Sequence, residues 1–201
     1  MREIDFLYIS YSEERIYIVM SLLLTKPINS IGGTFFVSFV TNHSSIKGEL
    51  LERFSKRGRV IREGGDSISR TDWGCEGDVN YLDILQPIMD DHITNVIKLL
   101  CPPDVANIKA EERVIWFQQY ERNDEHDWHY HGDCNLSSIY YVELPEGTPI
   151  TKFSMFGREF SVNVKEGCIL SFPSLYPHCS PMNESLDRKS VISFNLNIGH
   201  K

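Results

Sequence analysis

The stretch "DWHYHGDCNLSSIYYVEL" (127–144) repeats metal-ligand side chains at alternate positions and then runs into an apolar strand. His129, His131 and Asp133 are each two residues apart, and residues at this spacing in a β-strand point to one face. Side chains two positions apart start about 6.6 Å from each other and can share an ion, whereas 129 and 133 start about 13 Å apart. The ligand pair is therefore either His129 with His131 or His131 with Asp133, and His131 belongs to both.

Short apolar segments surround this stretch from about residue 111 onward. Turn signals such as "RND", "PEG", "KEG", "PSLYP" and "NESLD" separate them. Many short strands at close spacing are typical of a β-sandwich or barrel. We expect strands at 113–120, 127–133, 136–144, 151–156, 158–164, 168–173 and 189–198.

The first 110 residues have a mixed texture. Strands are expected at 5–10 and 34–40, a short helix at 44–57, and a loop at 62–74. The segment 80–100 has apolar residues at helical spacing and is followed by "CPP", which ends a helix. With no linker between the halves, we expect a single domain, 1–201. Its N-terminal strands and supporting helices would span 1–110, and a β core would span 111–201.

Composition excludes several classes of function. The chain has 201 residues, 41% hydrophobic and 24% charged, which fits an ordinary globular domain. The net charge of −8 disfavours broad nucleic-acid binding. The longest mostly apolar run, 16–24, is too short to cross a bilayer, and the N-terminus lacks a signal-peptide layout. Five cysteines without a C-x-x-C pair favour reduced thiols and a cytoplasmic location.

A distant histidine and a following arginine give the alternating motif its context. His178 follows a strand and a proline-rich turn, and Arg188 comes ten residues later (188 − 178). Arg188, Ser190 and Ile192 are expected to share one face of the last strand. A guanidinium on a buried face needs an anionic partner, for which its planar fork suits a carboxylate. These features together predict a metal that binds an acidic co-substrate.

Residues from about 113 to 198 resemble the Fe(II)/2-oxoglutarate-dependent oxygenases, in the group related to prolyl hydroxylases. The pattern of that group is H-x-D, a distal histidine, and an Arg or Lys about one strand later. "HGD" (131–133), "PH" (177–178) and "RKS" (188–190) match it residue by residue. The resemblance covers a little under half of the chain. It implies a mainly β fold with some α: a double-stranded β-helix, or cupin-like jelly roll, with N-terminal helical support.

The same resemblance implies an iron site. Its ligands would be His131, Asp133 and His178, with His129 as the alternative first ligand. Counted from Tyr120, the interval to His129 is nearer the family's usual interval, which would place His131 where the carboxylate belongs. We prefer the set with Asp133, because two histidines and one carboxylate form the commoner ferrous site and leave positions open for co-substrate and oxygen.

The family also implies the reaction. Iron would be chelated by the 2-oxo acid end of 2-oxoglutarate, Arg188 would pair with its distal carboxylate, and Ser190 and Tyr141 would add hydroxyl contacts. With O2, oxidative decarboxylation to succinate would be coupled to hydroxylation of a substrate. A prolyl residue in a protein or peptide is the default substrate, and a small molecule is the alternative.

Two other classes of function remain as alternatives. A non-catalytic cupin-like protein would keep the barrel and bind a metal only. A metallo-β-lactamase-like hydrolase carries H-x-H-x-D-H, one residue away from the present motif, but there the motif should lead into a helix. Here it leads into the strand 136–144. His126, in the charged turn "NDEHD", is expected to be solvated.

Overall fold

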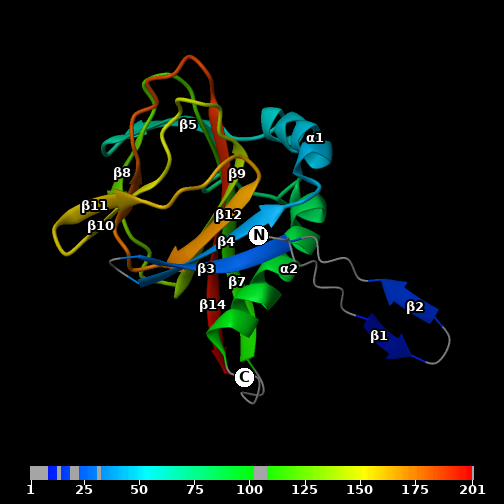
Figure 1. Ribbon diagram of the computed structural model, residues 1–201. Helices are drawn as coiled ribbons and strands as arrows, with labels where there is room; N and C mark the ends of the chain where they lie inside the picture. The colour runs from blue at the N-terminus through cyan, green and yellow to red at the C-terminus, as the bar shows by residue number, and fades with distance from the viewer. Residues whose placement is uncertain (1–8, 13–14, 19–22, 31–32, 102–107, 201) are drawn as a thin grey trace.

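In the part of the chain that it describes, the structure is mainly β with two helices (Figure 1). It is a computed structural model that describes residues 9–12, 15–18, 23–30, 33–101 and 108–200. The helices are α1 (His43–Ser55) and α2 (Leu82–Leu100). The strands are β1 (Ile9–Ser12), β2 (Arg15–Ile18), β3 (Leu23–Ser30), β4 (Gly33–Val40), β5 (Arg59–Glu63), β6 (Asp66–Thr71), β7 (Ile108–Tyr120), β8 (His126–His129), β9 (Leu136–Glu143), β10 (Lys152–Met155), β11 (Arg158–Ser161), β12 (Cys168–Pro173), β13 (His178–Ser180) and β14 (Lys189–His200).

A large antiparallel sheet forms the frame of the molecule, and the two helices pack on one of its faces (Figure 1). Its strand order is β3-β4-β12-β9-β14-β7-β6-β5. Helix α1 places Leu50 and Phe54 in the core, and α2 adds Leu85 and Met89. These side chains meet the even-numbered face of β14, which includes Ile192, Phe194 and Leu196. The helices therefore cover the side of the sheet that faces away from the motif.

A smaller sheet covers the opposite face of the frame, with strand order β11-β10-β13-β8. A second apolar cluster fills part of the space between the two sheets, and Phe35, Phe153, Phe172 and Val191 belong to it. Two sheets enclosing a core in this way form the predicted jelly roll, so the expected fold class is confirmed.

The central strands are buried on both faces, and their sequences show it. In β9, Tyr140 belongs to the helix-side cluster and its neighbour Tyr141 to the intersheet cluster. A strand covered on both faces reads as a continuous apolar run because neither parity faces water. The segment "LSSIYYVEL" (136–144) therefore does not reveal which of its side chains point toward the intersheet space.

The N-terminal half agrees only partly with expectation. The helices predicted at 44–57 and 80–100 are confirmed by α1 and α2, and the strand predicted at 34–40 by β4. The loop predicted at 62–74 is wrong, because β6 occupies 66–71 and pairs with β5 around Gly64 and Gly65, both at positive φ. This hairpin extends the large sheet next to β7. Residues 5–8 of the strand expected at 5–10 lie outside the described residues. Among the described residues, no helix is long and apolar enough to cross a membrane.

Candidate metal centre

Two histidines lie side by side on neighbouring strands of the small sheet. His129 ends β8, His178 begins β13, and the two are direct partners in this antiparallel pair. Directly opposed residues in antiparallel strands project to the same face, and here the ring centres are 4.2 Å apart. Residues 49 positions apart in the chain (178 − 129) thus meet in space.

Backbone carbonyls fix which nitrogen of each ring is free. His129 Nδ1 donates to the carbonyl of Asp127 (2.7 Å), and His178 Nδ1 donates to the carbonyl of Tyr176 (2.8 Å). A carbonyl oxygen can only accept, so each Nδ1 carries the proton and each Nε2 keeps its lone pair. Hydrogen bonds of this kind orient metal-ligating histidines in proteins.

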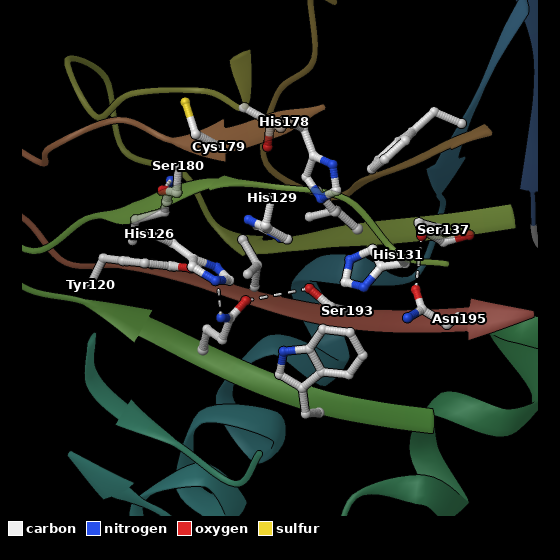
Figure 2. Close-up of a pocket in the computed structure, with 18 residues that line it drawn as sticks. Tyr120, His126, His129, His131, Ser137, His178, Cys179, Ser180, Ser193 and Asn195 are labelled. Atoms are coloured by element: carbon white, nitrogen blue, oxygen red, sulfur yellow. Dashed lines mark hydrogen bonds between the residues drawn. The ribbon is translucent and has the colours of Figure 1, made fainter. Parts of the chain in front are cut away.

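His131 completes the cluster from an irregular segment rather than from a strand. Its backbone N–H donates to the carbonyl of Ser174 (2.9 Å), which ties the loop after β8 to the loop after β12. Its ring centre lies 5.2 Å from that of His129 and 5.3 Å from that of His178. One nitrogen from each of these three rings lies within 4.8 Å of the others, an arrangement that could hold a metal ion (Figure 2).

All three rings are held in the form that binds metals. Burial lowers the pKa of His178 to about 3 and that of His131 to about 4, and it lowers the pKa of His129 below its usual value. Histidines with lowered pKa values are neutral near pH 7 and do not need to lose a proton before coordination. Three neutral imidazoles suit iron, zinc, copper or nickel.

Asp133, the carboxylate of the preferred ligand set, is placed differently from the histidines. Its side chain is exposed, and the described metal-ligand cluster consists of His129, His131 and His178 without it. The strand expected at 127–133 ends at His129, so the alternation on which Asp133 depended stops there. The structure thus brings together the set that the sequence offered as the alternative.

The side chains of β14 that line the pocket belong to odd-numbered residues, whereas the sequence predicts even-numbered ones. Arg188 lies outside the pocket between the sheets, where its Nε and Nη2 donate to Glu143 at 2.9 and 3.2 Å. Ser190 also points away from the pocket and donates to Glu143 (2.5 Å). The expectation that Arg188 and Ser190 face the site is wrong, because the odd-numbered residues of β14 face it instead. Glu143 already satisfies the guanidinium.

Lys189 is the cation that enters the pocket. It is 2% exposed, and its Nζ donates to the carbonyl of Pro149 (3.1 Å) and to the hydroxyl of Ser180. The ammonium also lies 4.6 Å from the centre of the Tyr120 ring. No carboxylate of a described residue pairs with it, and burial lowers the pKa of Lys189 to about 7. A buried cation without an anion is costly unless a ligand supplies the charge.

Tyr141 is near the pocket but does not line it. The side chain is fully buried, and its hydroxyl is 2.8 Å from the hydroxyl of Thr151, which does line the pocket. A direct contact between Tyr141 and a ligand is therefore not part of the arrangement. Thr151 is the group that the tyrosine orients.

His126, expected in solvent, is a further pocket residue. Its ring stacks on that of His129 with centres 4.0 Å apart, and the Gln118 amide lies 3.2 Å from its Nδ1. Figure 2 shows His126 and Tyr120 toward one end of the pocket, and Ser137 and Asn195 toward the other. The sequence carried a signal for part of this group. Within 189–198, the odd positions hold the polar residues that line a site in an otherwise apolar strand.

Solved structures with this fold are known, although the sequence alone identifies no relatives. No protein-family model matches the chain, and no curated protein matches it. A Pseudomonas putida prolyl-4-hydroxylase superposes with a TM-score of 0.54 at 16% identity, covering 77% of this chain and 85% of that one. The viral collagen prolyl hydroxylase of Paramecium Bursaria Chlorella virus-1, as its 2-oxoglutarate complex, gives 0.53 at 14% identity, covering 75% and 88%.

A third solved structure is that of an enzyme named for a different reaction. SnoK, an alpha-ketoglutarate-dependent carbocyclase from nogalamycin biosynthesis, has a TM-score of 0.58 at 9% identity, covering 83% of this chain and 81% of that one. At such identities the likeness establishes a shared fold. The function has to be argued from the residues of this chain.

Proposed function

We propose that the protein is a non-haem iron oxygenase that couples oxidative decarboxylation of 2-oxoglutarate to hydroxylation of a substrate. The observation that carries the proposal is one pocket that holds both a three-histidine cluster and a buried lysine without a carboxylate partner among the described residues. The first is suited to a metal and the second to an anion. The fold, shared with oxygenases that use this metal and co-substrate, agrees with this combination.

His129, His131 and His178 are proposed to hold the iron through one nitrogen each. Three protein ligands would leave positions on a bound iron open to other molecules. Bound ferrous iron would supply the oxygen chemistry of the reaction. The protein keeps the three rings neutral and, at His129 and His178, fixes the rotation of the ring through the carbonyls of Asp127 and Tyr176.

Lys189 is proposed to bind the distal carboxylate of 2-oxoglutarate, in place of Arg188. Its ammonium is buried, and Ser180 and Thr151 add hydroxyl groups to the lining of the same pocket. A carboxylate here would offset the cost of the buried charge and favour the protonated amine. The Tyr120 ring beneath the ammonium adds a cation–π contact that keeps it in place.

For the substrate, we propose a prolyl residue in a protein or peptide, with a small molecule as the alternative. Two of the solved structures of similar fold are prolyl hydroxylases, and SnoK supports the alternative. The net charge of −8 weighs against broad nucleic-acid binding. All five cysteines are free, which suits the proposed cytoplasmic location.

A metal-binding protein without oxygenase activity is the second candidate, and one observation favours it. The cluster contains three histidines and no carboxylate, a donor set that also binds zinc. Such a protein would bind metal but would have no use for Lys189.

The two candidates differ in their response to 2-oxoglutarate. Under argon, the iron-loaded oxygenase should bind 2-oxoglutarate and develop a visible charge-transfer band, and added O2 should then yield succinate. His178→Ala is the matched control, because it removes a ligand and should abolish both signals. A protein that loads iron but shows neither band nor succinate would be the metal-binding candidate.

A further inference from the structure

The floor of the pocket carries a polar group that the proposed iron and 2-oxoglutarate sites do not use. Asn195 on β14 is paired with Ser137 on β9, and both side chains line the pocket although each is only 2% exposed. Ser193, one row back along β14, is paired with Trp116 on β7. All four residues line the pocket, and Figure 2 shows Ser137, Ser193 and Asn195 at the end where His131 lies.

The carboxamide of Asn195 has donors to spare. Ser137 Oγ donates to Asn195 Oδ1 (2.9 Å), so the oxygen is occupied and the NH2 group is left over. No described residue accepts a hydrogen bond from that nitrogen, and it is not enclosed among the buried atoms that lack a partner. The nitrogen is therefore open to the pocket and can donate to a ligand that carries an acceptor.

This donor lies far from Lys189 along the same strand. The two residues are six positions apart on one strand (195 − 189), which corresponds to about 20 Å between their Cα atoms. Asn195 therefore lies toward the other end of the pocket from Lys189. Figure 2 shows Ser180, which binds Lys189, on one side of the three histidines and Asn195 on the other.

Aromatic side chains lead from the surface to this end of the pocket. The Trp116 ring is centred 6.0 Å from that of His131 and 4.6 Å from that of Trp73, which is 42% exposed. Among the described side chains that line the pocket, Lys189 is the one lysine or arginine. The end at Asn195 therefore offers neutral donors beside aromatic rings, which suits a neutral acceptor better than a carboxylate.

We propose that Asn195, oriented by Ser137, forms a subsite for an amide carbonyl of the primary substrate. The carbonyl oxygen accepts from the carboxamide NH2, and the adjoining apolar ring or side chain packs against Trp116 and Trp73. A carbonyl suits this position because it has two lone pairs and no proton of its own. Calling the ligand the primary substrate rests on the proposed function.

The test compares two probes of the same shape on metal-free protein. N-Acetylpyrrolidine presents an amide oxygen, and N-thioacetylpyrrolidine presents the weaker acceptor sulfur. Ligand-observed NMR titrations should show the oxygen probe binding about 3- to 10-fold more tightly to the wild type, the worth of one net hydrogen bond. Asn195→Asp is nearly isosteric but has no N–H, so it should erase this preference while still binding both probes.

Ser193→Ala is the matched control, because it removes a hydroxyl one row away that already faces the Gln118 oxygen at 3.5 Å. It should keep the preference. Equal affinity of the wild type for the two probes, or a preference for the oxygen probe in Asn195→Asp, would contradict the proposed subsite. Repeating the titrations with N-acetyl-L-proline methylamide distinguishes a peptide from a single amide as the source. No 2-oxoglutarate or turnover enters, so failure here is distinct from failure of the oxygenase proposal.

Discussion

Arg188 and Lys189 are neighbours in the sequence, but they lie on opposite sides of the large sheet. Arg188 is partly exposed and forms a two-point ion pair with Glu143, whereas Lys189 is buried beside Tyr120 and has no carboxylate partner among the described residues. The difference shows that charge alone does not identify a binding residue. Lys189, which has no carboxylate partner among the described residues, is the cation that we propose to bind an anion.

The same contrast separates the candidate ligands. His131 turns toward His129 and His178, and Asp133, two residues later, is exposed. In both pairs, one side chain faces the pocket and the other faces solvent or another residue. Substitutions made in pairs can therefore test the assignment of each face.

The largest difference is expected between His129→Ala and Asp133→Ala. Loss of a group that merely orients a ligand already costs about 10- to 100-fold in metal affinity, so loss of His129 itself should exceed that. Asp133→Ala changes an exposed residue and should stay within about twofold of the wild type. Iron content after anaerobic loading and desalting measures both. Equal losses, or a larger loss in Asp133→Ala, would restore the carboxylate to the ligand set.

Lys189→Ala compared with Arg188→Ala should give the next largest effect, on affinity for 2-oxoglutarate. Removing one partner of a buried charge pair costs about 2–5 kcal/mol, or roughly 30-fold to several thousand-fold in dissociation constant. Arg188→Ala should leave this constant close to that of the wild type, because its partner is Glu143. Titration of 2-oxoglutarate into iron-loaded, oxygen-free protein provides the values, and the reverse ranking would return the role to Arg188.

The pH dependence of co-substrate binding sharpens the role of Lys189. Its pKa of about 7 means that the amine is neutral above pH 7 in the free protein, whereas a bound carboxylate favours the charged form. Binding above pH 7 must then take up a proton, and the apparent dissociation constant should rise about tenfold per pH unit. Below pH 7 this contribution should be flat.

Other groups facing Lys189 should not produce this profile. Burial lowers the pKa of His126 to about 3, raises that of Cys179 to about 11, and raises that of Tyr120 well above its usual value. None of them changes charge between pH 7 and 9. Titrations at half-unit steps over this range provide the measurement, and a flat curve would contradict an anion contact at Lys189.

The smallest effect should come from the ion pair on the other face. Arg188 and Glu143 are 36% and 15% exposed, so solvent screens part of their attraction. A double-mutant cycle with Arg188→Ala and Glu143→Ala should give a coupling of about 1 kcal/mol in the free energy of unfolding. Urea denaturation measures it. A much larger coupling accompanied by loss of 2-oxoglutarate binding would mean that the two faces are not independent.

The elements of the fold were largely predictable, but the face of each strand was not. The spacing of apolar residues predicts α1 and α2, and turn signals predict the strands after residue 111. The face to which each side chain points is harder to predict, because a shift by one residue sends every side chain to the other face of a sheet. Since the helices bury the even face of β14, both faces are covered, and the sequence did not show that Lys189 rather than Arg188 lines the pocket.

The site was predictable to the same extent. Spacing singled out His129, His131 and Asp133, and the resemblance added His178, but neither could show that the strand stops at His129. Asn195 falls among the polar odd positions of 189–198, but its pairing with Ser137 appears only when β9 and β14 are placed in register.

The facing pair His129 and His178 has a mechanical consequence. They belong to strands of only four and three residues, so the hydrogen-bonded ladder that joins β8 to β13 is short. An ion bound by both would act as a cross-link that closes the intervening chain into a loop and adds its binding energy to the stability of the folded form. A bound metal would therefore also hold β8 and β13 together. Its release would loosen the edge of the small sheet before the helix-covered frame begins to unfold.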